Sequence, residues 1–137
     1  MLRDACEYGR CIAVDMSVEQ AIEAAKGALK EEGFGVLCEI DVQKTLQEKI
    51  GAQVEPYVIL GACNPNFAHQ SLQQEPNLGL LLPCNVIVRQ AEGATIVAAI
   101  DAQKLLSVVG NPALQAVAHE VNQRMDRVID KLDAMRR

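Results

Sequence analysis

Two Cys-Asn steps, Cys63-Asn64 and Cys84-Asn85, are the part of this sequence best suited to chemistry, and they lie 21 positions apart. A cysteine thiolate can attack an electrophile or bind a soft metal ion. An asparagine side chain both donates and accepts hydrogen bonds, so it can hold a polar ligand. One imidazole lies between the two steps and one carboxylate follows the second, which makes the candidate set Cys63, Asn64, His69, Cys84, Asn85 and Asp101.

Three interpretations of this set remain open. In the first, Cys63 and Cys84 are small core residues, and the two asparagines bind loop backbone at turns and caps. In the second, the set binds a small polar ligand or a soft metal ion such as zinc, with Cys63, Cys84 and His69 as candidate metal ligands, although their spacing matches no standard zinc knuckle. In the third, a thiol performs redox or nucleophilic chemistry. That chemistry requires a lowered thiol pKa, and no lysine or arginine occurs between residues 58 and 84 to lower it.

The strands and helices that must position these residues follow from hydrophobic spacing and turn signals. Apolar residues that alternate or run continuously predict strands, and apolar residues at i, i+3, i+4 and i+7 predict helices. We expect strands over residues 8–15, 34–41, 56–63, 79–89 and 94–100, helices over 17–32, 42–50 and 112–135, and a connection over 64–78 with a helical turn near 67–72.

Several boundaries have specific chemical signals. Ser17 with Gln20 three residues later forms a capping box at the start of the first helix, and Gly33 supplies a left-handed stop at its end. Asp101 is a candidate N-cap for a short helix over residues 102–106. Pro83 cannot donate to a strand ladder, so it predicts a bulge or a break in pairing within the fourth strand.

Strand order determines whether the candidate residues can meet. If the third, fourth and fifth strands are sequential antiparallel neighbours, the end of the third, the start of the fourth and the end of the fifth lie at the same end of the sheet. Cys63, Cys84 and Asp101 occupy those three places, and the connection that contains His69 begins and ends there. We therefore expect these residues at one rim of the sheet. Whether the two thiols share a face depends on the register around Pro83.

Composition excludes several classes of function. A net charge of -5 and the near absence of aromatic residues disfavour a nucleic-acid binder. No apolar run approaches the roughly 20 residues that span a bilayer, and the first residues are acidic where a secretory signal would be apolar. Five cysteines form an odd set without a CxxC motif, which favours reduced, mostly buried thiols in a cytoplasmic protein over a disulfide framework.

Four short segments carry a resemblance to a known family. They read LGACNP over residues 60–65, LLLPCNV over 80–86, GFGV over 33–36 and EIDV over 39–42. With them, the whole chain resembles the domain of unknown function 302 family. The resemblance implies a small TATA-binding-protein-like fold of the strand-helix-four strands-helix type, and often a homodimer. It implies no established activity.

Together these observations predict a single α+β domain spanning residues 1–137, with a five-stranded antiparallel sheet and helices packed on one face. For function, we expect a non-enzymatic binding module with a small-ligand or metal site at the Cys63/Cys84 rim. A thiol-dependent enzyme and a purely structural protein are the alternatives. The sequence does not identify a cofactor. The expected partners are a second copy of the chain and possible small molecules or soft metal ions, but neither nucleic acid nor a membrane.

Overall fold

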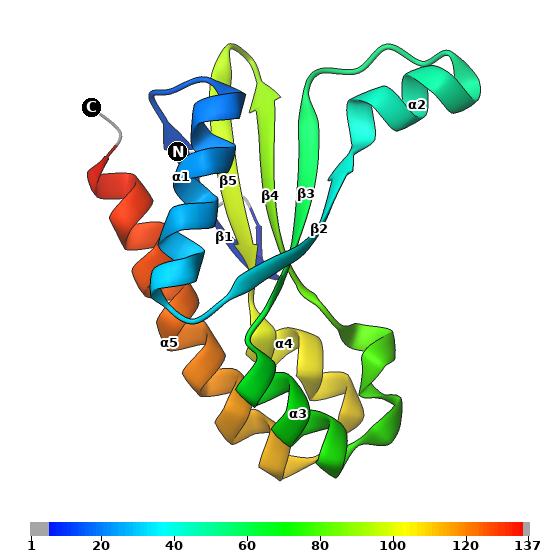
Figure 1. The fold of residues 1–137 in the computed structure, drawn as a ribbon, viewed down its shortest axis with the longest axis vertical. Helices are drawn as coiled ribbons and strands as arrows, with labels where there is room; N and C mark the ends of the chain where they lie inside the picture. The colour runs from blue at the N-terminus through cyan, green and yellow to red at the C-terminus, as the bar shows by residue number, and fades with distance from the viewer. Residues whose placement is uncertain (1–5, 136–137) are drawn as a thin grey trace.

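A computed structural model describes residues 6–135 as one sheet with helices around it (Figure 1). Its strands and helices follow the predicted order, with two added 3₁₀ segments over residues 76–81 and 107–109. The elements are β1 (Gly9–Val14), α1 (Val18–Glu31), β2 (Gly35–Asp41), α2 (Val42–Ile50), β3 (Tyr57–Cys63), α3 (Pro65–Gln74), the 3₁₀ helix η2 (Pro76–Leu81), β4 (Cys84–Ala91), β5 (Ala94–Ile100), α4 (Ala102–Leu106), the 3₁₀ helix η3 (Ser107–Val109) and α5 (Pro112–Ala134).

All five strands form one antiparallel sheet in the order β1-β5-β4-β3-β2. The strand β4 lies in the middle, as its nearly continuous apolar sequence predicts. Because β3, β4 and β5 are sequential neighbours, Cys63, Cys84 and Asp101 do lie at the same end of the sheet. The α+β class and the antiparallel five-stranded sheet are therefore confirmed.

The helices α1 and α5 pack side by side against one face of the sheet (Figure 1). Their apolar stripes meet the alternate residues of the strands that point toward them, and the resulting core is aliphatic. Its largest fully buried members are Ile12, Leu29, Leu60, Leu114, Ile129 and Leu132. We call the opposite side of the sheet the uncovered face.

Local signals set the ends of α1 as the sequence predicts. The Ser17 hydroxyl accepts a hydrogen bond from the Gln20 amide, and the Gln20 side chain accepts one from the Ser17 amide. The chain leaves the helix at Gly33 with φ +86°, a left-handed conformation that favours glycine. This turn directs the chain into β2.

The predicted fourth strand is wrong in its first half. Residues 76–81 form η2, the peptide bond before Pro83 is cis, and β4 begins only at Cys84. Proline lacks the amide proton that a ladder needs, so pairing cannot extend across Pro83. The turn expected near residues 67–72 is also longer, because α3 runs from Pro65 to Gln74.

No helix within the described part of the chain is both long and apolar enough to cross a membrane.

Candidate functional site

Cys63 and Cys84 line the same small cavity at the end of the sheet. The register pairs Ala62 with Cys84, so Cys63 lies one residue beyond that pair, at the end of β3. The cavity has a volume of about 40 Å³ and is closed by Phe67 of α3 and Leu106 of α4. Pockets for small organic ligands usually measure about 300–1,000 Å³. This cavity can therefore hold a water-sized molecule but not a metabolite.

Burial keeps both thiols of the cavity protonated. Desolvation, and secondarily the neighbouring Cys63, raises the pKa of Cys84 from 9.0 to about 11. Desolvation also raises the pKa of Cys63. A thiol must lose its proton to act as a nucleophile or a metal ligand, so this environment opposes both kinds of chemistry. Cys84 instead packs against the main core.

The expectation that most cysteines are buried is wrong. Of the five, only Cys11 is buried, Cys38 is exposed, and Cys6, Cys63 and Cys84 are half-buried. The reason is their position: Cys63 and Cys84 lie at strand ends, Cys38 lies on the edge strand β2, and Cys6 precedes the first strand, so neighbours cover these four only in part.

Asn64 performs a structural task at the same rim. Its side-chain oxygen accepts hydrogen bonds from the backbone amides of Asn66 and Phe67, at 3.1 and 3.2 Å, and so caps α3. The residue is buried. Its polar oxygen is therefore already used by the fold, as the structural interpretation of the Cys-Asn step predicts.

His69 does not join the two cysteines. It lies on α3 with an exposed side chain and does not line the cavity. Among residues 6–135, no three or more His, Cys, Asp or Glu side chains are grouped so that they could hold a metal ion. Of these four residue types, Cys63 and Cys84 are the ones from the described chain that line the rim cavity.

Asn85 points to the uncovered face, away from the cavity. It lies with Ile87 and Arg89 in a groove of about 490 Å³. Cross-strand register places Tyr57 directly opposite Arg89. The groove spans β1, β5, β4 and the first residue of β3, and the lining side chains used below are Cys11, Tyr57, Asn85, Ile87, Arg89 and Ala98.

The floor of this groove belongs to an apolar row that crosses the whole sheet. The register aligns one residue from each strand in the order Cys11, Ala98, Ile87, Ile59 and Ile40. None of the five belongs to the main core. The nearly continuous apolar sequence of β4 already indicates that both faces of this strand are apolar. The pattern does not say which face the helices leave open.

Comparison with known proteins places the chain in a family. The sequence pattern of the family described as domain of unknown function DUF302 matches residues 11–132. The chain belongs to this family. An uncharacterized conserved DUF302 protein from Bacillus stearothermophilus is similar in structure, with a TM-score of 0.87 and 31% identity over 93% of this chain and 99% of that one. A search of curated proteins finds no match. The family resemblance of the sequence is thus confirmed.

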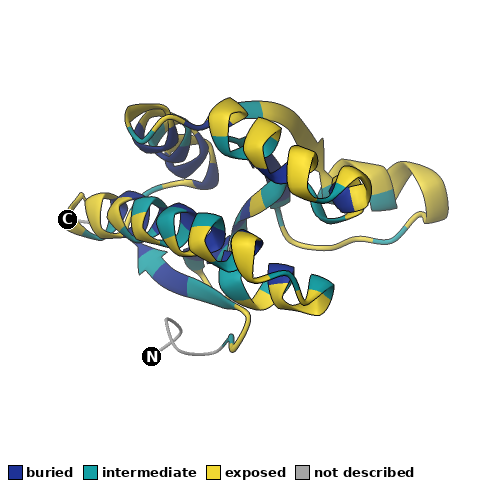
Figure 2. Cartoon of the chain, turned by 90° about the horizontal axis from the view of Figure 1, so that it is seen from below, coloured by how far each residue is buried: buried dark blue, intermediate teal, exposed yellow. Residues whose placement is uncertain are grey.

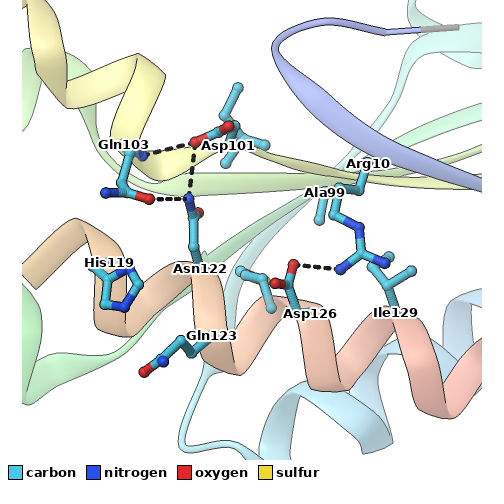
Figure 3. A pocket seen from close by; sticks show the side chains of 11 residues that line it. Arg10, Ala99, Asp101, Gln103, His119, Asn122, Gln123, Asp126 and Ile129 are labelled. Carbon is cyan, nitrogen blue, oxygen red and sulfur yellow. Dashed lines mark hydrogen bonds and ion pairs between the residues drawn. The ribbon is translucent and has the colours of Figure 1, made fainter. Parts of the chain in front are cut away.

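In this DUF302 protein, Asp101 is the centre of a polar network that lies apart from the thiols (Figure 3). Its carboxylate caps α4 by accepting hydrogen bonds from the backbone amides of Gln103 and Lys104, at 3.0 and 3.1 Å. It also accepts one from the side-chain amide of Asn122, at 2.9 Å. Burial alone would raise the pKa of Asp101, but these hydrogen bonds outweigh it and the pKa is lowered. The N-cap prediction for Asp101 is confirmed.

Asn122 of α5 is the member of this network that sequence reasoning missed. Its side-chain oxygen accepts the backbone amide of Ala102 at 2.8 Å, so it fastens the start of α4 to α5. The network borders a cavity of about 200 Å³ that also contains Arg10, His119 and Asp126. Arg10 forms an ion pair with Asp126. The cavity lies between β1, β5 and α5.

The segment formed by β2, α2 and the loop to residue 56, which we call the arm, projects from the body of the domain (Figures 1 and 2). No residue of α2 is buried. Large apolar side chains of the arm are exposed to solvent, with Leu37 at 69% and Ile50 at 72% of their full accessible area. Helices of this length are marginal in water without packing.

Proposed function

We propose that this DUF302 protein is a non-enzymatic binding module whose ligand lies in the groove of the uncovered face. One observation carries the proposal. The groove, with about 490 Å³, has the size of a small-molecule site, whereas the predicted rim cavity has about 40 Å³. The groove combines an apolar floor with a few polar groups, Tyr57, Asn85 and Arg89, as ligand sites commonly do.

Of the residues predicted for the site, Asn85 belongs to this groove. Asn64 and Asp101 serve as helix caps, His69 is exposed on α3, and the two rim thiols are protonated and share a small cavity. The raised pKa values of Cys63 and Cys84 support a non-enzymatic role, because a protonated thiol is a poor nucleophile.

A neutral fluorescent dye, Nile red, tests the groove without reference to charge. We expect its fluorescence to rise and shift to the blue when it binds the native protein, and we expect the variant Ala98→Trp, which fills the groove floor, to lose most of that signal. Ala116→Trp, on the exposed side of α5, is the matched control and should behave like the native chain. Far-ultraviolet circular dichroism verifies that both variants fold. Equal dye binding by Ala98→Trp and the native protein would refute the proposal.

The rim keeps one direct test of its own. Native mass spectrometry of protein purified without chelators would detect a metal ion retained by Cys63 and Cys84. We expect the mass of the metal-free chain. One bound metal ion per chain that is absent from the variant Cys63→Ser would show that the rim binds a metal, and it would support the rim as the binding site.

A second proposal is a homodimer formed through the arm. Its support is the exposure of Leu37, Ile40, Ile50 and Val54 on a segment whose helix has no buried residue. Burying one such side chain in an interface contributes about 1.5–3 kcal/mol.

We also propose a cytoplasmic location. Its support is the odd number of free cysteines, because a reducing compartment keeps thiols free.

Analytical ultracentrifugation at micromolar concentration tests the dimer. We expect a dimer for the native chain and at least tenfold weaker association for Ile50→Asp. Val108→Asp is the control, because Val108 is equally exposed (75%) but lies on η3, outside the arm. A native protein that sediments only as a monomer would end this proposal.

A further inference from the structure

We infer that the groove is specific for an anion with an apolar body, such as an aliphatic carboxylate, and that Arg89 binds the anionic group. This inference rests on the proposed groove site and adds the chemical class of its ligand. Among residues 6–135, the groove lining contains one group that is charged at every ordinary pH, the Arg89 guanidinium, and no aspartate or glutamate. The complementary ligand charge is therefore negative.

The position of Arg89 is unusual for a cation. It lies half-buried on the central strand, with Tyr57 opposite on β3 and Ile96 opposite on β5. Surface arginines of this domain generally have carboxylate partners, as Arg10 has Asp126 and Arg127 has Glu32. The Arg89 side chain forms neither a hydrogen bond nor an ion pair within residues 6–135.

Within the described part of the chain, the five N–H donors of this guanidinium therefore have solvent as their acceptor and no protein group. A carboxylate matches the guanidinium fork with two parallel hydrogen bonds, and such charge-assisted bonds are stronger than neutral ones. The phenol of Tyr57 sits across the strand pair and can donate to the same anion. Arg89 and Tyr57 thus make the polar end of the groove.

The apolar part of the groove has a direction. Arg89, Ile87 and Asn85 follow one another at alternate positions of β4, and Ala98 and Cys11 extend the floor beside Ile87. At about 3.3 Å per residue, the distance along β4 from residue 89 to residue 85 is about 13 Å. A linear or compact aliphatic body can therefore lie over Ile87 while its anionic group reaches Arg89.

Three eight-carbon probes separate the ligand class from the existence of the site. Octanoate, 1-octanol and octylammonium share one apolar body and differ in the charge of the end group. Titration followed by amide chemical shifts in NMR gives the affinity of each at millimolar concentration. We expect octanoate to bind roughly tenfold more tightly than 1-octanol, and octylammonium to bind most weakly. Added salt should weaken the binding of octanoate and leave the binding of 1-octanol unchanged.

Variants assign the preference to Arg89. Arg89→Gln should reduce octanoate binding to the level of 1-octanol without changing 1-octanol itself, and Arg89→Lys should keep part of the preference because it keeps the charge. Arg127→Gln removes one positive charge from the exposed side of α5 and should leave all three affinities unchanged.

The outcomes distinguish the two proposals. If none of the probes shifts the amides of the groove, the proposed binding site is itself wrong. If the probes bind there with equal affinity, or if Arg89→Gln keeps the octanoate preference, the groove stands as a site and its assignment to anions is overturned.

Discussion

Cys84 is the thiol whose reactivity best discriminates between the structural and the chemical interpretation of the Cys-Asn steps. Burial and the neighbouring Cys63 raise its pKa from 9.0 to about 11. The thiolate is the reactive species, and each unit of pKa changes its fraction tenfold at a pH below both values. We therefore expect Cys84 to react with iodoacetamide at neutral pH about a hundredfold more slowly in the folded chain than in the unfolded chain.

The assay is a timed reaction that is quenched, digested and analysed by mass spectrometry, so that the peptides report the cysteines separately. Cys38 is exposed and serves as the internal control, whose rate should change little on unfolding. The gap for Cys84 should close as the pH rises from 9 toward 11, because the unfolded thiol is then largely ionised while the folded thiol continues to titrate.

One result would refute this reasoning. If folded Cys84 reacts at neutral pH as fast as the unfolded control or faster, its thiolate must be stabilised by the fold. That result would support the redox or nucleophilic interpretation of Cys84. Slow labelling accompanied by a large loss of stability in Cys84→Ser would instead identify the residue as part of the packing.

Three further predictions concern the elements around the site. In Gly61→Ala, the new Cβ would lie 2.6 Å from the sulfur of Cys38, so we expect a loss of about 1–3 kcal/mol in urea unfolding; an unchanged midpoint would contradict this contact. Asn122→Ala leaves the first amide of α4 without its acceptor and should cost about 1–3 kcal/mol, whereas Gln123→Ala should change the unfolding free energy by less than about 0.5 kcal/mol. Because the folded pKa of Asp101 is lowered, its carboxylate stabilises the fold above the unfolded pKa, and this stability is lost as the pH falls through the folded pKa. Asp101→Asn should therefore flatten the acid side of the stability curve, and an identical acid side in both proteins would show that the network is not linked to protonation.

The elements that the sequence predicts well are those with local and redundant signals. Ser17 and Gln20 satisfy each other's amides within one turn, so the start of α1 depends on no distant residue. The helices over 42–50 and 112–135 end or begin at a glycine or proline whose backbone preference is intrinsic. Such features survive any arrangement of the remaining chain.

The prediction for the segment before Pro83 was wrong because its structure depends on distant residues. Leu80, Leu81 and Leu82 are apolar, and a short apolar run is compatible with a strand or with a helical turn. The decision between them depends on the pairing partners that are available. Since β3 ends one residue beyond the pair of Ala62 and Cys84, residues 79–82 have no strand beside them, and residues 79–81 belong to the 3₁₀ helix η2 instead.

The candidate site shows the same limit at the level of side chains. Strand order correctly brings Cys63, Cys84 and Asp101 to one end of the sheet, but it does not determine where each side chain points. At strand ends, polar side chains have a local use because new helices begin there with unsatisfied amides. The side chains of Asn64 and Asp101 accept hydrogen bonds from such amides, as caps of α3 and α4, so these acceptors serve the fold.

A polar residue without such a local task is a better indication of a binding site than one at a conspicuous motif. Arg89 lies within β4, and Tyr57 is the first residue of β3, directly opposite Arg89. No helix begins at either residue, so neither side chain is needed as an acceptor for unsatisfied helix amides. Their polar groups are therefore available to a ligand. The alternation along β4 puts Val86 and Val88 on the face toward the core and Ile87 and Arg89 on the face of the groove, so the sequence already defines the two faces of the strand. Only the placement of both long helices on the same side of the sheet makes one of those faces a surface that can bind.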